Sequence, residues 1–125
     1  MNFPAQLKYT RDHEWAKIEG KTMTVGITDH AQSSLGDIVF VELPQVGKVV
    51  KPGDTFGVVE SIKAVSDLYS PAAGKVVEVN NRLPEDPGVV NRDPYGEAWM
   101  IKLELAEPAN MMSVDEYKKY VESLS

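Results

Sequence analysis

Short runs in which apolar and polar residues alternate recur along the chain, and they constrain its fold more than any other sequence feature. Residues 22–27 and 99–105 alternate most cleanly. Their inward positions are expected to be Met23, Val25 and Ile27 in the first run, and Trp99, Ile101, Leu103 and Leu105 in the second. A period of two residues is typical of strands that bury one face.

Further runs of β-branched or aromatic residues are bounded by glycine, proline, aspartate or asparagine. They occupy Ile38–Leu43, Phe56–Val59 and Val76–Val79. Turn-forming sequences separate the runs, at K-P-G-D, S-P-A-A-G and D-P-G. Many short strands with tight turns predict a mainly β protein, a sandwich or a barrel.

Two helices are expected at the periphery. The first covers Asp29–Leu35, capped by Thr28 or Asp29 and ended by Gly36. The second covers about 113–124, where Ser113 and Glu116 form the capping-box pattern ahead of apolar residues at helical spacing. The length of 125 residues suits one domain, 1–125.

Composition excludes several classes of protein. The net charge of −6 disfavours binding to nucleic acid, which selects basic surfaces. No apolar run approaches the roughly 20 residues of a membrane helix, so we expect no membrane partner. Cysteine is absent, and His13 and His30 have no metal-ligand spacing, so each is expected at the surface or hydrogen-bonded. The N-terminus resembles neither a signal nor a transit peptide, which predicts a cytoplasmic protein, with a processed mitochondrial form as the alternative.

Lys63 lies midway between two copies of the tetrapeptide G-K-V-V, at 47–50 and 74–77. Two similar strands around a central turn would place that turn at an extremity of the fold. A lysine there is either one more solubilising charge or an amine displayed for covalent modification.

Several segments resemble the glycine cleavage system H protein family, in the family's order. The octapeptide E-S-I-K-A-V-S-D around Lys63 resembles its lipoyl-attachment motif. The other matching segments are H-E-W at 13–15, V-G-I-T-D-H-A-Q at 25–32, L-G-D-I-V-F-V-E-L-P at 35–44 and V-N-R-D-P-Y-G-E-A-W-M at 90–100. Ile62 and Ala64 replace the methionines that flank the lysine of biotin carriers, and lipoyl domains of 2-oxo-acid dehydrogenases lack the other segments.

The resemblance implies a barrel-sandwich hybrid of the lipoyl/biotinyl type, with lipoate in amide linkage on Lys63. Such a protein carries the aminomethyl group from the glycine decarboxylase (P protein) to the aminomethyltransferase (T protein). Its reduced arm is reoxidised by dihydrolipoyl dehydrogenase (L protein). A lipoate ligase or a lipoyl/octanoyl transferase attaches the cofactor. The protein itself is then a carrier with no catalytic residues of its own.

A loaded arm would benefit from shelter, and its cationic amine needs an anionic acceptor. The resemblance implies that Glu14 and Asp67 line the sheltering cleft. If residues 12–15 form a strand, Asp12 and Glu14 share a face. Some relatives have serine in place of Asp12 and histidine in place of Ser34, so these two positions are weaker candidates.

Two other functions are open. The protein can be a lipoate reservoir or donor for lipoylation of 2-oxo-acid dehydrogenase complexes. Alternatively, Asp12, His13 and Glu14 can form the acid–base site of an enzyme, although the sequence shows no nucleophile constellation and no phosphate-binding glycine loop.

Overall fold

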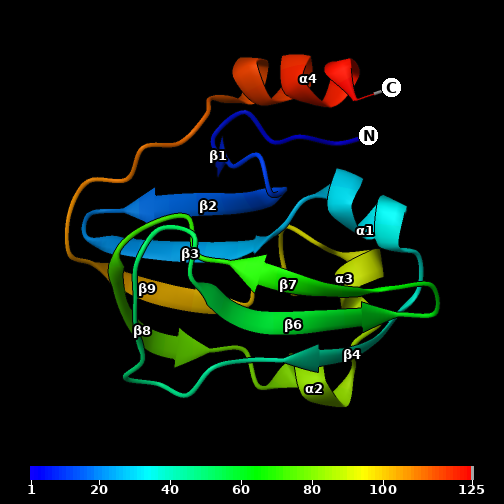
Figure 1. The fold of residues 1–125 in the computed structure, drawn as a ribbon, viewed down its shortest axis with the longest axis horizontal. Helices are drawn as coiled ribbons and strands as arrows, with labels where there is room; N and C mark the ends of the chain where they lie inside the picture. The colour runs from blue at the N-terminus through cyan, green and yellow to red at the C-terminus, as the bar shows by residue number, and fades with distance from the viewer. Residues whose placement is uncertain (125) are drawn as a thin grey trace.

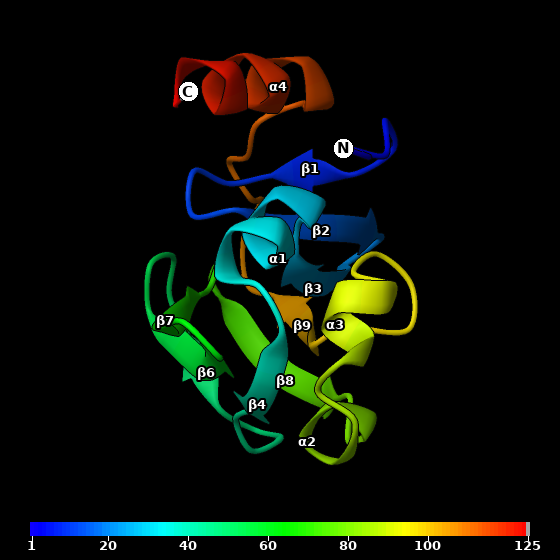
Figure 2. The ribbon, with the colours of Figure 1, turned by 90° about the vertical axis from the view of Figure 1, so that its right-hand side faces the viewer.

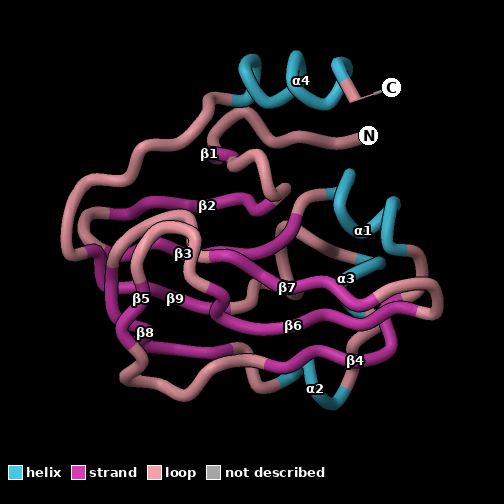
Figure 3. Tube along the Cα trace, in the orientation of Figure 1, coloured by secondary structure: helices cyan, strands magenta, loops and turns pink. Residues whose placement is uncertain are grey.

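Residues 1–124 are described in the computed structural model, and they form two antiparallel sheets (Figures 1 and 3). Ser125, the last residue of the predicted domain, lies outside the described residues. The larger sheet has the strand order β1-β2-β3-β9-β8-β5, and the smaller has the order β4-β6-β7. The strands are β1 (Lys8–Tyr9), β2 (Glu14–Glu19), β3 (Thr22–Ile27), β4 (Ile38–Glu42), β5 (Val49–Val50), β6 (Thr55–Ser61), β7 (Val65–Tyr69), β8 (Gly74–Val79) and β9 (Ile101–Leu105).

The main core lies between the two sheets. Met23 and Val25 of β3 and Leu103 of β9 enter it from the larger sheet, and Val41 and Val59 enter it from the smaller one. Each of these side chains is almost fully buried. The mainly β prediction is therefore confirmed, and the inward face predicted for residues 22–27 is the buried one.

The strand predicted at 99–105 begins two residues later. The ladder between β9 and its neighbours ends at Ile101, which pairs with both Val25 and Val79. Before that point the chain leaves the pleat, so Met100 is buried and Trp99 is only half-buried. The Lys102 ammonium lies 5.1 Å from the centre of the Trp99 ring. The inward position predicted for Trp99 is wrong for this reason.

The predicted helices form with the predicted caps. In α1 (Asp29–Leu35) the Thr28 side chain accepts from the Ala31 N–H, and Gly36 ends the helix with a φ of 79°, which favours glycine. In α4 (Val114–Ser123) the capping box of Ser113 and Glu116 is complete. Two one-turn helices, α2 (Arg82–Glu85) and α3 (Val89–Arg92), were not predicted, because four residues are too few to show a helical period.

A second, aromatic cluster joins α4 to the edge of the larger sheet. The rings of Tyr9 and Tyr117 are stacked with centroids 4.6 Å apart, and Phe3 meets Tyr117 edge-on. Figure 2 shows α4 lying over β1 at one end of the molecule. This cluster also fixes the start of β2, where several of the predicted site residues lie.

Candidate functional site

Lys63 lies in the tight turn that joins β6 to β7. The Ser61 N–H donates to the Ala64 carbonyl over 2.8 Å. The Ser61 hydroxyl accepts from the backbone N–H groups of Lys63 and Ala64, each over 3.1 Å. The Ser61 side chain therefore satisfies two backbone donors inside the turn, and no residue of the turn has a positive φ. The turn therefore needs no glycine, and Lys63 is exposed at its tip.

In the sequence, the hairpin that carries Lys63 lies between the two copies of the tetrapeptide G-K-V-V. Val49 of β5 pairs with Lys75 of β8, and Val50 pairs with Gly74, so the copies are neighbours in the larger sheet. The chain between them forms the long β6–β7 hairpin, whose turn lies at the right-hand extremity in Figure 1. The predicted position of this turn is confirmed.

Glu14, by contrast, is a buried carboxylate with only 2 % of its surface exposed. Its Oε1 accepts from the Thr10 hydroxyl over 2.8 Å. Its Oε2 lies 3.4 Å from the backbone nitrogen of Tyr69, the last residue of β7. Because β7 is an edge strand, this N–H has no strand partner on that side. Glu14 therefore links the start of β2 to the free edge of the hairpin strand.

Burial is the main influence on the titration of Glu14. It raises the pKa of the carboxyl to about 7, because a carboxylate removed from water loses hydration. The Thr10 hydrogen bond opposes this rise in pKa, the nearby Asp12 charge adds to it, and the Tyr69 N–H opposes it. A strongly perturbed acid next to a lysine-bearing hairpin is a candidate functional group.

Asp12 and Glu14 do not share a strand face, and that prediction is wrong. Strand β2 begins only at Glu14, and His13 has a φ of 67°, which breaks the alternation. Asp12 is consequently exposed in the turn before the strand, while Glu14, Trp15 and Ala16 are all buried.

The residues of the H-E-W segment have three separate environments. The His13 ring nitrogen Nδ1 lies 2.8 Å from the Tyr117 hydroxyl, and burial lowers the pKa of His13, with His30 as the second cause. Glu14 turns toward Thr10. Trp15 donates to the Pro94 carbonyl and lies against Gly26, where a Cβ atom would come within 2.7 Å of the indole. Asp12, His13 and Glu14 therefore do not converge on one acid–base site.

Asp67 and Ser34 are both exposed, the first in β7 and the second in α1. Asp67 lies opposite Val58 in the β6–β7 ladder, on the outer face of the smaller sheet. Two residues after Asp67 in the sequence is Tyr69, whose N–H meets Glu14. Ser34 lies in the last turn of α1. The fold thus brings Glu14 next to β7 and leaves Asp12, Ser34 and Asp67 in solvent.

Sequence reasoning missed the groups that hold this region together. One of these groups is Tyr117 in α4, whose hydroxyl lies 2.8 Å from both His13 Nδ1 and Thr28 Oγ1. Burial raises the pKa of Tyr117 to about 12. His13 is hydrogen-bonded as predicted. His30 is half-buried, and its Nδ1 atom has no hydrogen-bond partner among the described residues.

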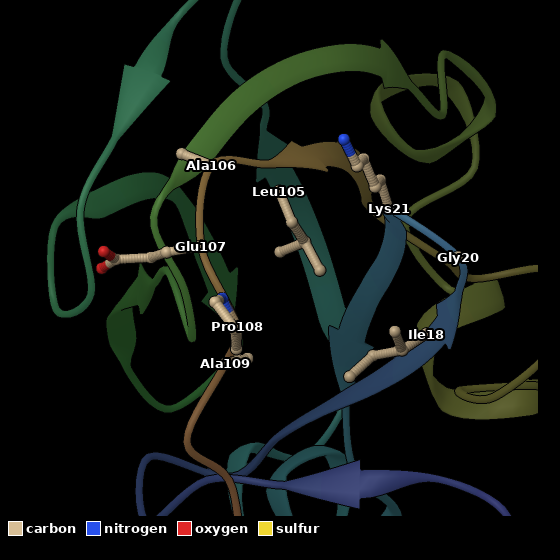
Figure 4. Close-up of a pocket in the computed structure, with 8 residues that line it drawn as sticks. All are labelled: Ile18, Gly20, Lys21, Leu105, Ala106, Glu107, Pro108 and Ala109. Atoms are coloured by element: carbon tan, nitrogen blue, oxygen red, sulfur yellow. The ribbon is translucent and has the colours of Figure 1, made fainter.

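A surface pocket of about 480 Å³ lies away from all these residues. It is formed by the β2–β3 turn and the segment after β9, at the end of the molecule opposite the β6–β7 turn (Figures 1 and 4). The apolar side chains of Ile18 and Leu105 face it, and Glu107 points away from it (Figure 4). None of the predicted site residues lines it. Within residues 1–124 there is also no helix long and apolar enough to cross a membrane.

Two sheets packed around one core, with a lysine at the tip of a protruding hairpin, define a barrel-sandwich hybrid of the lipoyl/biotinyl type. A crystal structure of a glycine cleavage system H protein from Mycobacterium marinum superposes with a TM-score of 0.91. That protein is 40 % identical, and the match covers 96 % of this chain and 99 % of the other.

Sequence comparison agrees with the structural one. Residues 7–125 match the family described as "Glycine cleavage H-protein". The glycine cleavage system H protein of Rubrobacter xylanophilus is 58 % identical over 119 residues, covering 95 % of this chain and 94 % of the relative. That of Carboxydothermus hydrogenoformans is 56 % identical over 122 residues, with the same coverage of 95 % and 94 %. The chain belongs to the glycine cleavage H-protein family, as its motifs predicted.

Proposed function

We propose that this protein is the lipoyl-bearing shuttle of a glycine cleavage system, with lipoate in amide linkage on Lys63. The observation that supports this most directly is the place of Lys63, exposed at the tip of a rigid hairpin within the E-S-I-K-A-V-S-D motif. A modifying enzyme needs an accessible amine on a well-ordered element, and this turn provides one without disturbing the core.

The role proposed for the protein is to transfer a one-carbon unit between separate enzymes. It receives the aminomethyl group that the P protein makes from glycine by decarboxylation and delivers it to the T protein, which passes the carbon to tetrahydrofolate and releases ammonia. The L protein then restores the disulfide with NAD⁺ as oxidant. The lipoyl group supplies the reactive disulfide, and the protein supplies attachment, presentation and shelter. Tethering raises the local concentration of the transferred group to roughly millimolar at each partner.

Glu14 is the residue that we propose shelters the loaded arm. Its carboxylate is deeply buried, and burial raises its pKa because the charged form lacks the hydration that water would give it. A cationic amine docked beside it would compensate that charge and keep water from the aminomethyl group. Asp67 is proposed at the mouth of this site, with Asp12 and Ser34 as peripheral contacts. Their exposure limits what each contributes.

Glycine-dependent loading tests this function. Lipoylated protein, incubated with P protein and glycine, should gain the mass of methylamine on Lys63, and unmodified protein should gain nothing. Lipoylated protein that is never loaded by a P protein, but gives its lipoyl group to a 2-oxo-acid dehydrogenase subunit in the presence of a transferase, would instead establish the reservoir function.

A further inference from the structure

The attachment hairpin does not end freely in solvent, because its turn is bonded to another part of the fold. The Ile62 N–H, next to Lys63 in the turn, donates to the Asp37 carbonyl over 3.1 Å. Asp37 belongs to the corner Gly36–Ile38, which connects α1 to β4. One end of this corner also starts the β4–β6 ladder, where Ile38 pairs with Ser61. The position of the turn is thus set by the position of the corner.

The side chain of Lys63 itself lies over this corner. A Cβ atom built on Gly36 would lie 3.2 Å from the Lys63 Cε and 3.8 Å from its Nζ. The absence of a side chain at residue 36 therefore lets the aliphatic stem of the lysine rest on the backbone. The corner supports both the backbone of the turn and the amine that the turn displays.

Asn91, in α3, holds the corner from the other side. Its Oδ1 accepts from the Ile38 N–H over 2.9 Å, and its Nδ2 donates to the Gly36 carbonyl over 2.9 Å. The same Nδ2 donates to Gln32 Oε1 over 3.0 Å, which ties the corner to α1. One amide thus satisfies the carbonyl at one end of the three-residue corner and the N–H at its other end. Figure 2 shows the α1–β4 connection between the β6–β7 hairpin and α3.

From this chain of contacts we infer that Asn91 is a positioning residue for Lys63. It acts through the Gly36–Ile38 corner and the Ile62–Asp37 hydrogen bond, and it fixes where the amine is presented to the enzyme that acylates it. The inference rests on the proposed attachment of lipoate to Lys63. The hydrogen bonds of Asn91 go to Gln32, Gly36 and Ile38 and not to Lys63, so its loss should impair presentation and leave the chemistry of the amine unchanged.

The chain contains a matched control in Asn80. Its side chain also makes three hydrogen bonds, in this case all to the backbone: it donates to the Glu97 and Trp99 carbonyls and accepts from the Arg82 N–H. Among the described residues, none of these partners is hydrogen-bonded to the hairpin turn. Asn80→Ala therefore removes a comparable set of bonds without touching the corner.

The experiment compares Asn91→Ala, the milder Asn91→Asp, Asn80→Ala and the parent protein, all unmodified. Asn91→Asp keeps an acceptor for the Ile38 N–H and loses the donor to Gly36, so it remains informative if the alanine variant does not fold. Two quantities are measured below the unfolding temperature: amide hydrogen exchange at Ile62, by NMR, and kcat and KM for lipoylation by a lipoate ligase.

We expect exchange at Ile62 to be about tenfold faster in Asn91→Ala, less accelerated in Asn91→Asp and unchanged in Asn80→Ala. The kcat/KM for lipoylation should fall about tenfold in Asn91→Ala and stay at the parent level in Asn80→Ala, although both variants melt earlier. Parent-like exchange at Ile62 in both Asn91 variants, or equal losses of lipoylation in Asn91→Ala and Asn80→Ala, would overturn the inference. If the parent protein accepts no lipoate, the proposed attachment fails, and exchange at Ile62 still decides whether Asn91 positions the turn.

Discussion

The turn at Lys63 and the surroundings of Glu14 are built in opposite ways. The lysine is exposed, on a short turn whose backbone is satisfied by Ser61 and Asp37. The glutamate is 2 % exposed, and among the described residues its carboxylate has two hydrogen-bond partners, one of them at 3.4 Å. A residue that must meet other enzymes needs access, whereas a residue that must hold a charged group gains strength from exclusion of water. The contrast agrees with the proposal that one part serves for attachment and the other for shelter.

The largest effect is expected when Lys63 is substituted. Lys63→Arg keeps the charge and the approximate length of the side chain but removes the only amine that the hairpin tip offers. We expect complete loss of lipoylation and of glycine turnover in a mixture of this protein with P, T and L proteins. Unchanged thermal unfolding would serve as the control, since an exposed turn residue contributes little to stability.

A large but partial effect on the lifetime of the methylamine-loaded form is expected when Glu14 is substituted. In Glu14→Gln the side chain keeps its shape and loses its charge. The methylamine-loaded form should lose methylamine about tenfold faster, because a charge-assisted hydrogen bond contributes about 1.5–3 kcal/mol. The measurement is mass spectrometry of the isolated loaded protein over time. Lipoylation of Lys63 should proceed at the parent rate, and a parent-like lifetime of the loaded form would remove Glu14 from the shelter.

The same residue should give stability a specific dependence on pH. The pKa of Glu14 is raised from 4.5 to about 7 in the folded protein, so between these values the folded state binds more protons than the unfolded state. The free energy of unfolding should therefore fall as pH rises through this window, by about 3 kcal/mol, with the loss complete above about pH 7. Denaturant titrations at pH 5 and pH 8 measure it. Glu14→Gln should lack this fall. The lowered pKa of His13 acts in the opposite direction over the same window, so the parent is compared with Glu14→Gln and not with itself alone. An equal change in stability between pH 5 and pH 8 in the two proteins would show that Glu14 titrates normally.

The smallest effect is expected at Asp67. Its carboxylate is exposed on the outer face of the hairpin, where solvent screens its interaction with a docked amine. Asp67→Asn should change the lifetime of the loaded form by less than about threefold, the equivalent of less than about 0.7 kcal/mol. A loss as large as that of Glu14→Gln would mean that the arm docks along the outer face of β7 and not beside Glu14.

Sequence reasoning succeeded where the signal was local. The Thr28 cap, Gly36 and the capping box at Ser113 each lie within a few residues of the helix end that they define, and both helices form where predicted. It failed at Trp99 and at the Asp12–Glu14 pair, because strict alternation was assumed where the backbone leaves the pleat, at Met100 and at His13.

The contacts of Glu14 and Asn91 could not be predicted from the sequence, for another physical reason. Glu14 meets the backbone N–H of a residue 55 positions away, and backbone groups carry no sequence signature. Asn91 likewise bonds mainly to backbone atoms of a distant corner. The motif around Lys63 could be recognised because the turn, the lysine and its neighbours are consecutive.

The central claim is that Lys63 is the point at which lipoate is attached. Intact-mass analysis and peptide mapping of the protein made with ample lipoate in its native host test it most directly. One lipoyl adduct, on the peptide that contains Lys63 and on no other lysine, is the result that we predict. A biotinyl adduct, a lipoyl group on a different lysine, or no adduct at all would contradict it.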